Sequence, residues 1–108
     1  MNEYRVRIAR DAEDDLREIV QFIASVDTVQ KAEVVLDTIL DVCDSLKAYP
    51  GRGRYVPELK AVGVTAFREL IRTPHRIIYE ISGRTVQVLV IADGRRSLGA
   101  LLHSRLVR

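Results

Sequence analysis

The stretch AFRELIRTPHRIIYEISGRTVQVLVIA, residues 66–92, decides the fold. It contains three apolar-rich segments, residues 66–72, 75–82 and 85–92, separated by Thr73-Pro74 and by Gly83-Arg84. Both separators have the length of a hairpin turn, and the last two segments are rich in valine and isoleucine, whose branched side chains favour strands. We therefore predict three strands that follow one another as an antiparallel meander.

One strand and one helix are predicted at the N-terminal end of the chain. Tyr4, Val6 and Ile8 alternate with arginines, which is the two-residue period of a half-buried strand. Asp11 is the expected cap of a first helix that ends near Ser25. The apolar stripe of that helix consists of Ala12, Leu16, Ile19, Val20 and Ile23.

A second helix follows after a short break at residues 26–28. Because the break is so short, the two helices should form an antiparallel hairpin. Val35 and Val42 widen the apolar stripe of the second helix to about 160°. Such a stripe is either buried between the first helix and the sheet or left partly free for a partner. Its members are Val29, Ala32, Leu36, Ile39, Leu40, Cys43 and Leu46.

The remaining segments complete an α+β fold of the order β-α-α-β-β-β-(α). Pro50 and the two glycines at positions 51 and 53 end the second helix and start a loop. Residues 97–108 carry leucines at helical spacing and predict a short final helix, or a segment that orders on binding. We expect residues 1–108 to form a single domain, in which the helical hairpin packs on one face of an antiparallel sheet.

Composition excludes several classes of protein. With 47% hydrophobic and 30% charged residues, the chain has neither a disordered nor a fibrous composition. Its longest apolar run, residues 88–92, is far shorter than the roughly 20 residues of a membrane helix, and no signal peptide is visible, so we expect a cytoplasmic protein without a membrane partner. The single Cys43 lies in the apolar stripe and is interpreted as a small buried side chain.

Charge is divided unevenly along the chain. Residues 1–49 contain six Lys and Arg against eleven Asp and Glu, whereas residues 50–108 contain eleven against four. The second half is therefore expected to meet an anionic partner, such as nucleic acid or an acidic peptide.

The expected binding surface is a group of arginines on the sheet. If the strands pair as hairpins, four of them could converge on one open face, with two more on the preceding loop, and the guanidinium group matches phosphate oxygens well. Each arginine could instead form an ion pair with Glu58, Glu69, Glu80 or Asp93, but four carboxylates cannot neutralise eleven cations. The candidate phosphate-binding residues are Arg68, Arg72, Arg76 and Arg96 on the sheet, Arg52 and Arg54 on the loop, and Arg95 beside Arg96.

Residues for catalysis are less evident than residues for binding. The sequence shows no metal-ligand spacing and no nucleotide loop, so we expect neither a metal nor another cofactor. Metal-free RNA cleavage would need a general acid and a general base beside the cations. The candidates are His75, expected in a turn, His103, expected in the tail, and Tyr55, Tyr79 and Glu80.

Taken together, these residues resemble the RelE/ParE superfamily of toxins from type II toxin-antitoxin systems. The resemblance rests on the order of elements and on Pro50-Gly51-Arg52-Gly53-Arg54, Phe67-Arg68-Glu69-Leu70, His75-Arg76-Ile77-Ile78-Tyr79 and Ile91-Ala92-Asp93-Gly94-Arg95-Arg96. It covers nearly the whole chain. It implies a toxin that arrests growth and is held inactive by a co-expressed antitoxin, as in plasmid-stabilisation systems.

The resemblance implies one of two targets. Members similar to RelE cleave mRNA on the ribosome, and Arg68, Arg76 and Arg96 match three of their basic positions, with His103 as the acid or base if this chain is a ribonuclease. Leu70 and Leu102 depart from that pattern. The segment Asp93-Gly94-Arg95-Arg96 at the end of the last strand and the longer helices look more like ParE. That resemblance implies inhibition of DNA gyrase without catalysis, and a partner similar to the ParD antitoxin.

A third hypothesis belongs to a different class of protein. The basic half would also suit a nucleic-acid-binding domain that is not toxic. Such domains stack bases on aromatic side chains, which are sparse in this half of the chain.

Overall fold

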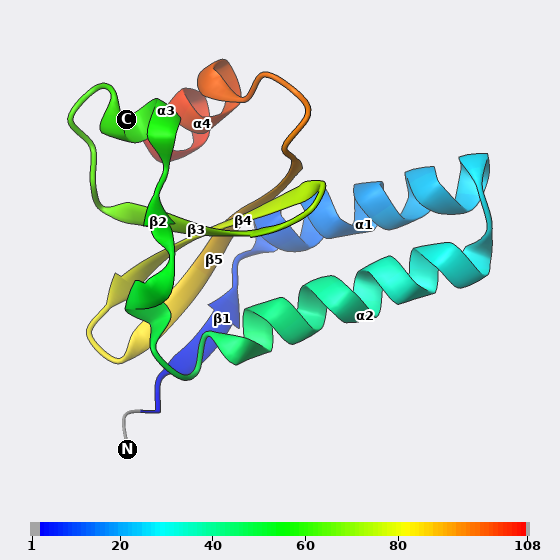
Figure 1. Ribbon diagram of the computed structural model, residues 1–108, viewed down its shortest axis with the longest axis horizontal. Helices are drawn as coiled ribbons and strands as arrows, with labels where there is room; N and C mark the ends of the chain where they lie inside the picture. Colours follow the sequence, from blue (N-terminus) through cyan, green and yellow to red (C-terminus); the bar gives the residue numbers. More distant parts are fainter. Residues whose placement is uncertain (1–2, 108) are drawn as a thin grey trace.

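A five-stranded sheet forms the centre of the fold in the computed structural model, which describes residues 3–107 (Figure 1). The strand order is β1-β5-β4-β3-β2. Strands β3 (Phe67–Arg72), β4 (His75–Ser82) and β5 (Thr85–Asp93) pair antiparallel in sequence order. The predicted meander is therefore confirmed. Gly83, at φ +60°, supplies the left-handed backbone of the turn between β4 and β5.

Strand β1 (Arg5–Ile8) occupies one edge of the sheet and pairs parallel with β5. The sheet is thus mixed at this edge, whereas the sequence predicted antiparallel pairing throughout. The parallel arrangement follows from the connection, because the helical hairpin and three further strands, β2 to β4, separate β1 from β5 along the chain. Alternation within β1 is as predicted, with Val6 and Ile8 packed against the core.

The predicted helical hairpin is confirmed as α1 (Arg10–Val26) and α2 (Val29–Ser45). Thr28 caps α2 by accepting a hydrogen bond from the Lys31 backbone N–H. The predicted cap of α1 is wrong, since the N-cap residue is Ala9 and Asp11 lies in the first helical turn. The Ala9 N–H donates a hydrogen bond to the Val88 carbonyl, so the pairing between β1 and β5 continues to the residue before the helix.

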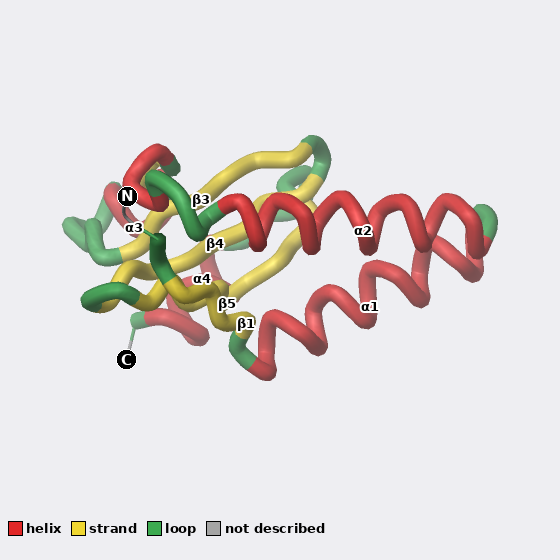
Figure 2. The backbone as a smooth tube through the Cα atoms, turned by 90° about the horizontal axis from the view of Figure 1, so that it is seen from below, coloured by secondary structure: helices red, strands yellow, loops and turns green. Residues whose placement is uncertain are grey.

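The hairpin packs on one face of the sheet and extends well beyond it (Figure 2). Its core includes Leu16, Ile39 and Leu46, which meet Ile77 and Tyr79 of β4. Cys43 belongs to the same core, and burial raises the pKa of its thiol to about 11, as expected for a structural cysteine. Among residues 3–107, no helix is long and apolar enough to cross a membrane.

The opposite face of the sheet is covered as well. The segment after α2 forms a short 3₁₀ helix η1 (Pro50–Arg52), strand β2 (Arg54–Tyr55) and helix α3 (Pro57–Lys60). The tail forms the predicted final helix, α4 (Gly99–Leu106). These elements build a second core, so the predicted open sheet face is wrong. The second core consists of Val56, Leu59, Phe67, Ile78, Val90, Ala92, Leu98 and Leu102.

A pair of charged side chains closes the edge of β5 beyond the end of β1. Asp15 of α1 accepts a hydrogen bond from the Ile91 N–H at 3.0 Å, and Arg105 of α4 donates to the Leu89 carbonyl at 2.8 Å. The two side chains also pair with each other through two contacts of 3.1 Å. They satisfy backbone groups that have no strand partner there, and they connect the helices on the two sides of the sheet.

Tyr79 fixes the loop that precedes β2. Its hydroxyl is buried, accepts a hydrogen bond from the Gly53 N–H at 3.2 Å and donates one to the Pro50 carbonyl. Tyr79→Phe removes both bonds without changing the shape of the core, and we expect it to lower the free energy of unfolding by about 1 to 2 kcal/mol. Urea unfolding at pH 7 measures the change. Equal stability of the variant and the wild type would contradict this role for the hydroxyl.

Candidate functional site

The sheet separates the arginines that were predicted to converge. In the antiparallel register Arg68 lies opposite Tyr79 and Arg72 opposite His75, on the face of the helical hairpin. Arg76 lies opposite Ile71 and projects from the other face, where α3 and α4 pack. The prediction of one shared arginine face is therefore wrong. The two-residue turn Thr73-Pro74 determines this register, because it pairs the residues directly on either side of it.

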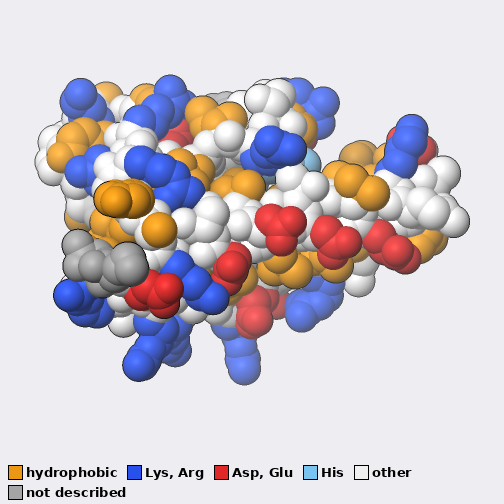
Figure 3. Space-filling view, turned by 60° about the horizontal axis from the view of Figure 1, so that its bottom comes forward, with side chains coloured by type: hydrophobic (Ala, Val, Ile, Leu, Met, Phe, Trp, Pro, Cys, Tyr) orange, Lys and Arg blue, Asp and Glu red, His pale blue; other side chains and the backbone are white. Residues whose placement is uncertain are grey.

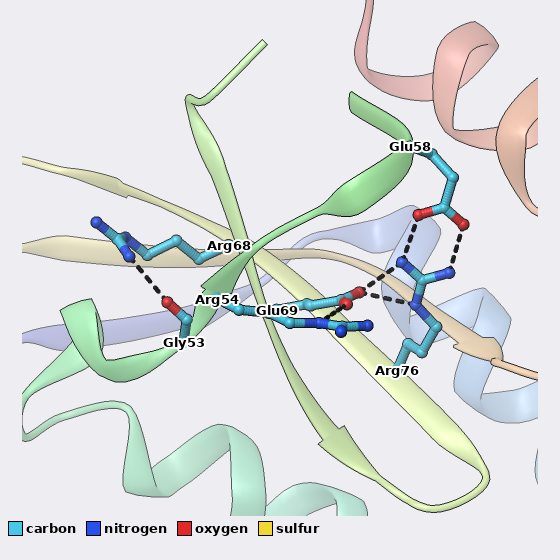
Figure 4. Close-up of polar contacts among 6 residues, drawn as sticks. All are labelled: Gly53, Arg54, Glu58, Arg68, Glu69 and Arg76. Carbon is cyan, nitrogen blue, oxygen red and sulfur yellow. Dashed lines mark hydrogen bonds and ion pairs between the residues drawn. The ribbon is translucent and has the colours of Figure 1, made fainter. Parts of the chain in front are cut away.

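Arg76 is at the centre of a buried ion-pair network (Figure 4). Its side chain is 9% exposed, and two of its nitrogens, Nη1 and Nη2, donate to the two carboxylate oxygens of Glu58 at 2.6 and 2.7 Å. Its Nε donates to Glu69 Oε1 at 2.7 Å, and Arg54 Nε donates to Glu69 Oε2 at 2.6 Å. Two arginines thus face two carboxylates, and the network as a whole carries no net charge.

The pKa shifts in the network follow from the same contacts. The hydrogen bonds from Arg76 hold the pKa of Glu58 below its usual value against the opposing effect of burial. The pKa of Arg76 is raised, mainly by its bonds to Glu58 and then by those to Glu69, while burial opposes the shift. Glu58 and Arg76 therefore both stay charged near neutral pH. The ion-pair alternative, considered for single arginines, is the arrangement found for Arg76 and Arg54.

Three other predicted arginines have partners too. Arg52 Nη1 donates to the Ala48 carbonyl at 2.8 Å and its Nη2 to Ser45 Oγ at 2.6 Å, so Arg52 satisfies the C-terminal end of α2. Arg68 donates to the Gly53 carbonyl at 2.8 Å and lies 4.5 Å from the centre of the Tyr55 ring. Arg95 binds Asp93 and lowers the pKa of that carboxyl to about 2.

Arg72 and Arg96 differ from these residues. Both are exposed, and within residues 3–107 neither takes part in an ion pair. They lie on different elements, since Arg72 ends β3 and Arg96 belongs to the loop between β5 and α4. Among the described residues, Arg72 and Arg96 are the members of the predicted set whose side chains have neither an ion pair nor a hydrogen bond. Arg52 and Arg68 also have no carboxylate partner, but neutral acceptors hold their side chains in place.

A shallow pocket of about 290 Å³ lies where the β3-β4 turn meets the end of β5. Gly94 lines it and approaches Arg76 closely, since a Cβ at this position would lie 3.0 Å from two carbons of the arginine side chain. The aliphatic part of Arg76 therefore forms a wall of the pocket, and its guanidinium group stays with Glu58 and Glu69. The lining residues are Arg54, Ile71, Thr73, Pro74, Arg76, Gly94 and Arg95.

The predicted acid and base candidates lie apart from this pocket. His75 is the first residue of β4 rather than part of an exposed turn, and it is 8% exposed on the hairpin face, where burial lowers its pKa. The Tyr79 hydroxyl is hydrogen-bonded to Pro50 and Gly53 in the loop before β2, and burial raises its pKa. His103 is exposed on α4, next to the fully buried Leu102.

Tyr55 and Glu80 complete the set of candidates. The Tyr55 hydroxyl lies 3.4 Å from Arg68 Nη2, and Glu80 is half-buried in β4 opposite Gln87. Within residues 3–107, no group of three His, Cys, Asp or Glu side chains is arranged to hold a metal ion.

Two features of the site were missed at the level of sequence. Glu58 was named only as one of several carboxylates, although Pro57 at the first position of a helix is a recognisable start signal for α3. The pair of Asp15 and Arg105 was not foreseen, because these residues are 90 positions apart and nothing local connects them.

The order of elements, with a long helical hairpin on an antiparallel meander and a short terminal helix, defines a small fold of the RelE/ParE toxin class. Two solved structures share it. The chromosomal ParDE toxin-antitoxin system from P. aeruginosa matches with a TM-score of 0.70 at 21% identity, covering 86% of this chain and 98% of that chain. The RelBE2 toxin-antitoxin complex from Mycobacterium tuberculosis matches with a TM-score of 0.64 at 20% identity, covering 86% and 93%.

Sequence comparison narrows the class to a family. Residues 6–98 match the ParE toxin of the type II toxin-antitoxin system parDE. Toxin ParE3 of Caulobacter vibrioides is 30% identical over 101 residues, which are 94% of this chain and 97% of that protein. The chain therefore belongs to the ParE family of type II toxins, as the sequence resemblance implied.

Proposed function

We propose that this toxin inhibits DNA gyrase, and that it does so by binding and without cleaving RNA. The proposal rests mainly on the ion pairs of Arg76 with Glu58 and Glu69. A ribonuclease site would need this guanidinium group to face the scissile phosphate, with an acid and a base beside it. Here it is bound to Glu58 and Glu69, while His75 and His103 lie elsewhere. The similarity to ParE toxins supports the same target.

The proposal includes a ParD-like antitoxin that keeps the toxin inactive in the cytoplasm. Part of the wide apolar stripe on the hairpin is free, since Val29 of α2 is 56% exposed and Leu40 is 39% exposed. Val34, outside the predicted stripe, is 64% exposed. Phe22 and Val26 of α1 are each 65% exposed. An antitoxin segment that covers these side chains would remove apolar surface from water. Without antitoxin, the free toxin would arrest growth.

Two assays on the purified toxin test the target. The first assay measures how fast gyrase supercoils relaxed plasmid in the presence of ATP. The second uses primer extension to detect cleavage of mRNA on translating ribosomes. We expect supercoiling to be inhibited and mRNA to remain intact. Arg96→Ala should weaken inhibition, because Arg96 is exposed and unpaired among the described residues, and Arg17→Ala on α1 is the control with the same loss of charge.

A different outcome would select the alternative function. Ribosome-dependent cleavage that is lost in Arg96→Ala or His103→Ala would contradict the proposal and identify the chain as an mRNA interferase similar to RelE. His103→Ala should leave gyrase inhibition unchanged, because inhibition by binding needs no general acid or base.

A further inference from the structure

A second group of arginines lies along the edge of the sheet formed by β1. Arg5 and Arg7 belong to β1, and Arg10 begins α1 shortly after that strand. Arg84 lies in the β4-β5 turn, beside the start of β1. Three of the four come from the half of the sequence with an acidic balance, so counting charge along the chain did not find them. We call these four residues the β1-edge surface.

The parallel pairing with β5 arranges this surface. The Arg5 N–H bonds to the Arg84 carbonyl at 2.8 Å, which places these two residues side by side. Val6 and Ile8 pack into the core together with Tyr4, so Arg5 and Arg7 project from the other face. Their Cα atoms are separated by about 6.6 Å along the strand, so the two guanidinium groups form a short cationic row. Arg84 lies over Tyr4 and joins them around the end of the strand rather than on their face.

The charge of the β1-edge surface is not neutralised within the described chain. All four arginines are exposed, and none takes part in the ion pairs found among residues 3–107. Figure 3, which brings the lower end of Figure 1 forward, shows Lys and Arg side chains projecting along its lower edge, with Asp and Glu side chains just above them. This contrasts with Arg54 and Arg76, whose charges are balanced internally.

The surface also contains a polar hollow. It has a volume of about 400 Å³ and is lined by Glu3, Tyr4, Arg5, Arg84 and Thr85. The Arg84 guanidinium lies 5.6 Å from the centre of the Tyr4 ring, which holds this arginine at the wall of the hollow. Glu3 is the carboxylate of the lining, against two arginines, so the hollow is cationic on balance.

We propose that the β1-edge surface binds the phosphodiester backbone of duplex DNA. Arginine side chains suit phosphate because the guanidinium fork donates two parallel hydrogen bonds to its oxygens. Thr85 and Gln87, the neighbours of Arg5 and Arg7 on β5, add polar side chains to the same face. An acidic protein partner would need apolar anchors, but Val6 and Ile8 point inward. A single strand would need free aromatic rings, but Tyr4 is occupied by Arg84.

The test is direct binding of the purified toxin to a fluorescent 20-base-pair DNA duplex, followed by anisotropy between 50 and 200 mM salt. Each phosphate contact contributes roughly 0.9 to the slope of log affinity against log salt. Arg5→Gln/Arg7→Gln should therefore lower the slope by about 1.8 and weaken binding on the order of 60-fold near 100 mM salt. The assay contains no gyrase, so its result does not depend on the proposed target.

Arg17→Gln/Lys31→Gln is the matched control, because it removes the same charge from exposed positions on the hairpin. It should leave the slope unchanged, and thermal melting should show that both variants are folded. An equal loss in the control would overturn the proposal, since general charge would then explain binding. Salt-independent binding would overturn it, and so would full displacement of the DNA by polyglutamate at matched charge, which would assign the surface to an acidic protein.

Discussion

Glu69→Ala is expected to lower the free energy of unfolding by about 3 kcal/mol. The Glu69 carboxylate is fully buried and accepts hydrogen bonds from both Arg54 and Arg76. Its removal leaves the guanidinium group of Arg76 at 9% exposure with only one of its two anionic partners. Arg54 is 56% exposed, so water can solvate its guanidinium group once Glu69 is removed. The expected loss is therefore at the lower end of the roughly 3 to 5 kcal/mol that breaking a buried ion pair costs.

Urea unfolding of Glu69→Ala at pH 7 measures this effect, with Glu80→Ala as the matched control. Glu80 is half-buried, projects from the same sheet face as Glu69 and takes part in none of the ion pairs of residues 3–107. The control should change stability by about 0.5 kcal/mol. Similar losses in both variants would show that the network adds nothing beyond the packing of the side chain.

Asp15→Ala should be the second most damaging substitution, with a loss of about 2 to 3 kcal/mol. It leaves the Ile91 N–H without its acceptor and removes the carboxylate that pairs with Arg105. Both side chains are only 18% exposed, so water replaces the lost contacts poorly. Because this pair connects α1 with α4, the terminal helix should also open more often than the rest of the fold.

Hydrogen exchange distinguishes this local effect from general destabilisation. The amides of α4, such as that of Leu102, should lose more protection in Asp15→Ala than the amide of Ile39 in α2. Asp14→Ala is the control, since its pair with Arg17 is exposed and should contribute less than about 1 kcal/mol. Equal loss of protection in α4 and α2 would refute the specific role of Asp15 in holding the terminal helix.

The sequence alone determined the local elements and the family. Apolar residues at a helical period placed α1 and α2, and branched residues between two short turns placed β3, β4 and β5. These patterns are local, because each helix or strand must turn its own apolar side chains toward a core. The motifs around Arg68, Arg76 and Arg96 were sufficient for the resemblance to RelE/ParE toxins, which the match over residues 6–98 confirms at the level of the ParE family.

Tertiary structure alone decided which charges remain free. The strand register placed Arg68 and Arg76 on opposite faces, and α3 brought Glu58 onto Arg76 from 18 positions away. Parallel pairing of β1 with β5 collected exposed arginines at the other edge of the sheet. Net charge counts residues without regard to distance, whereas an ion pair needs contact within about 4 Å, so the location of uncompensated charge depends on how distant segments pack.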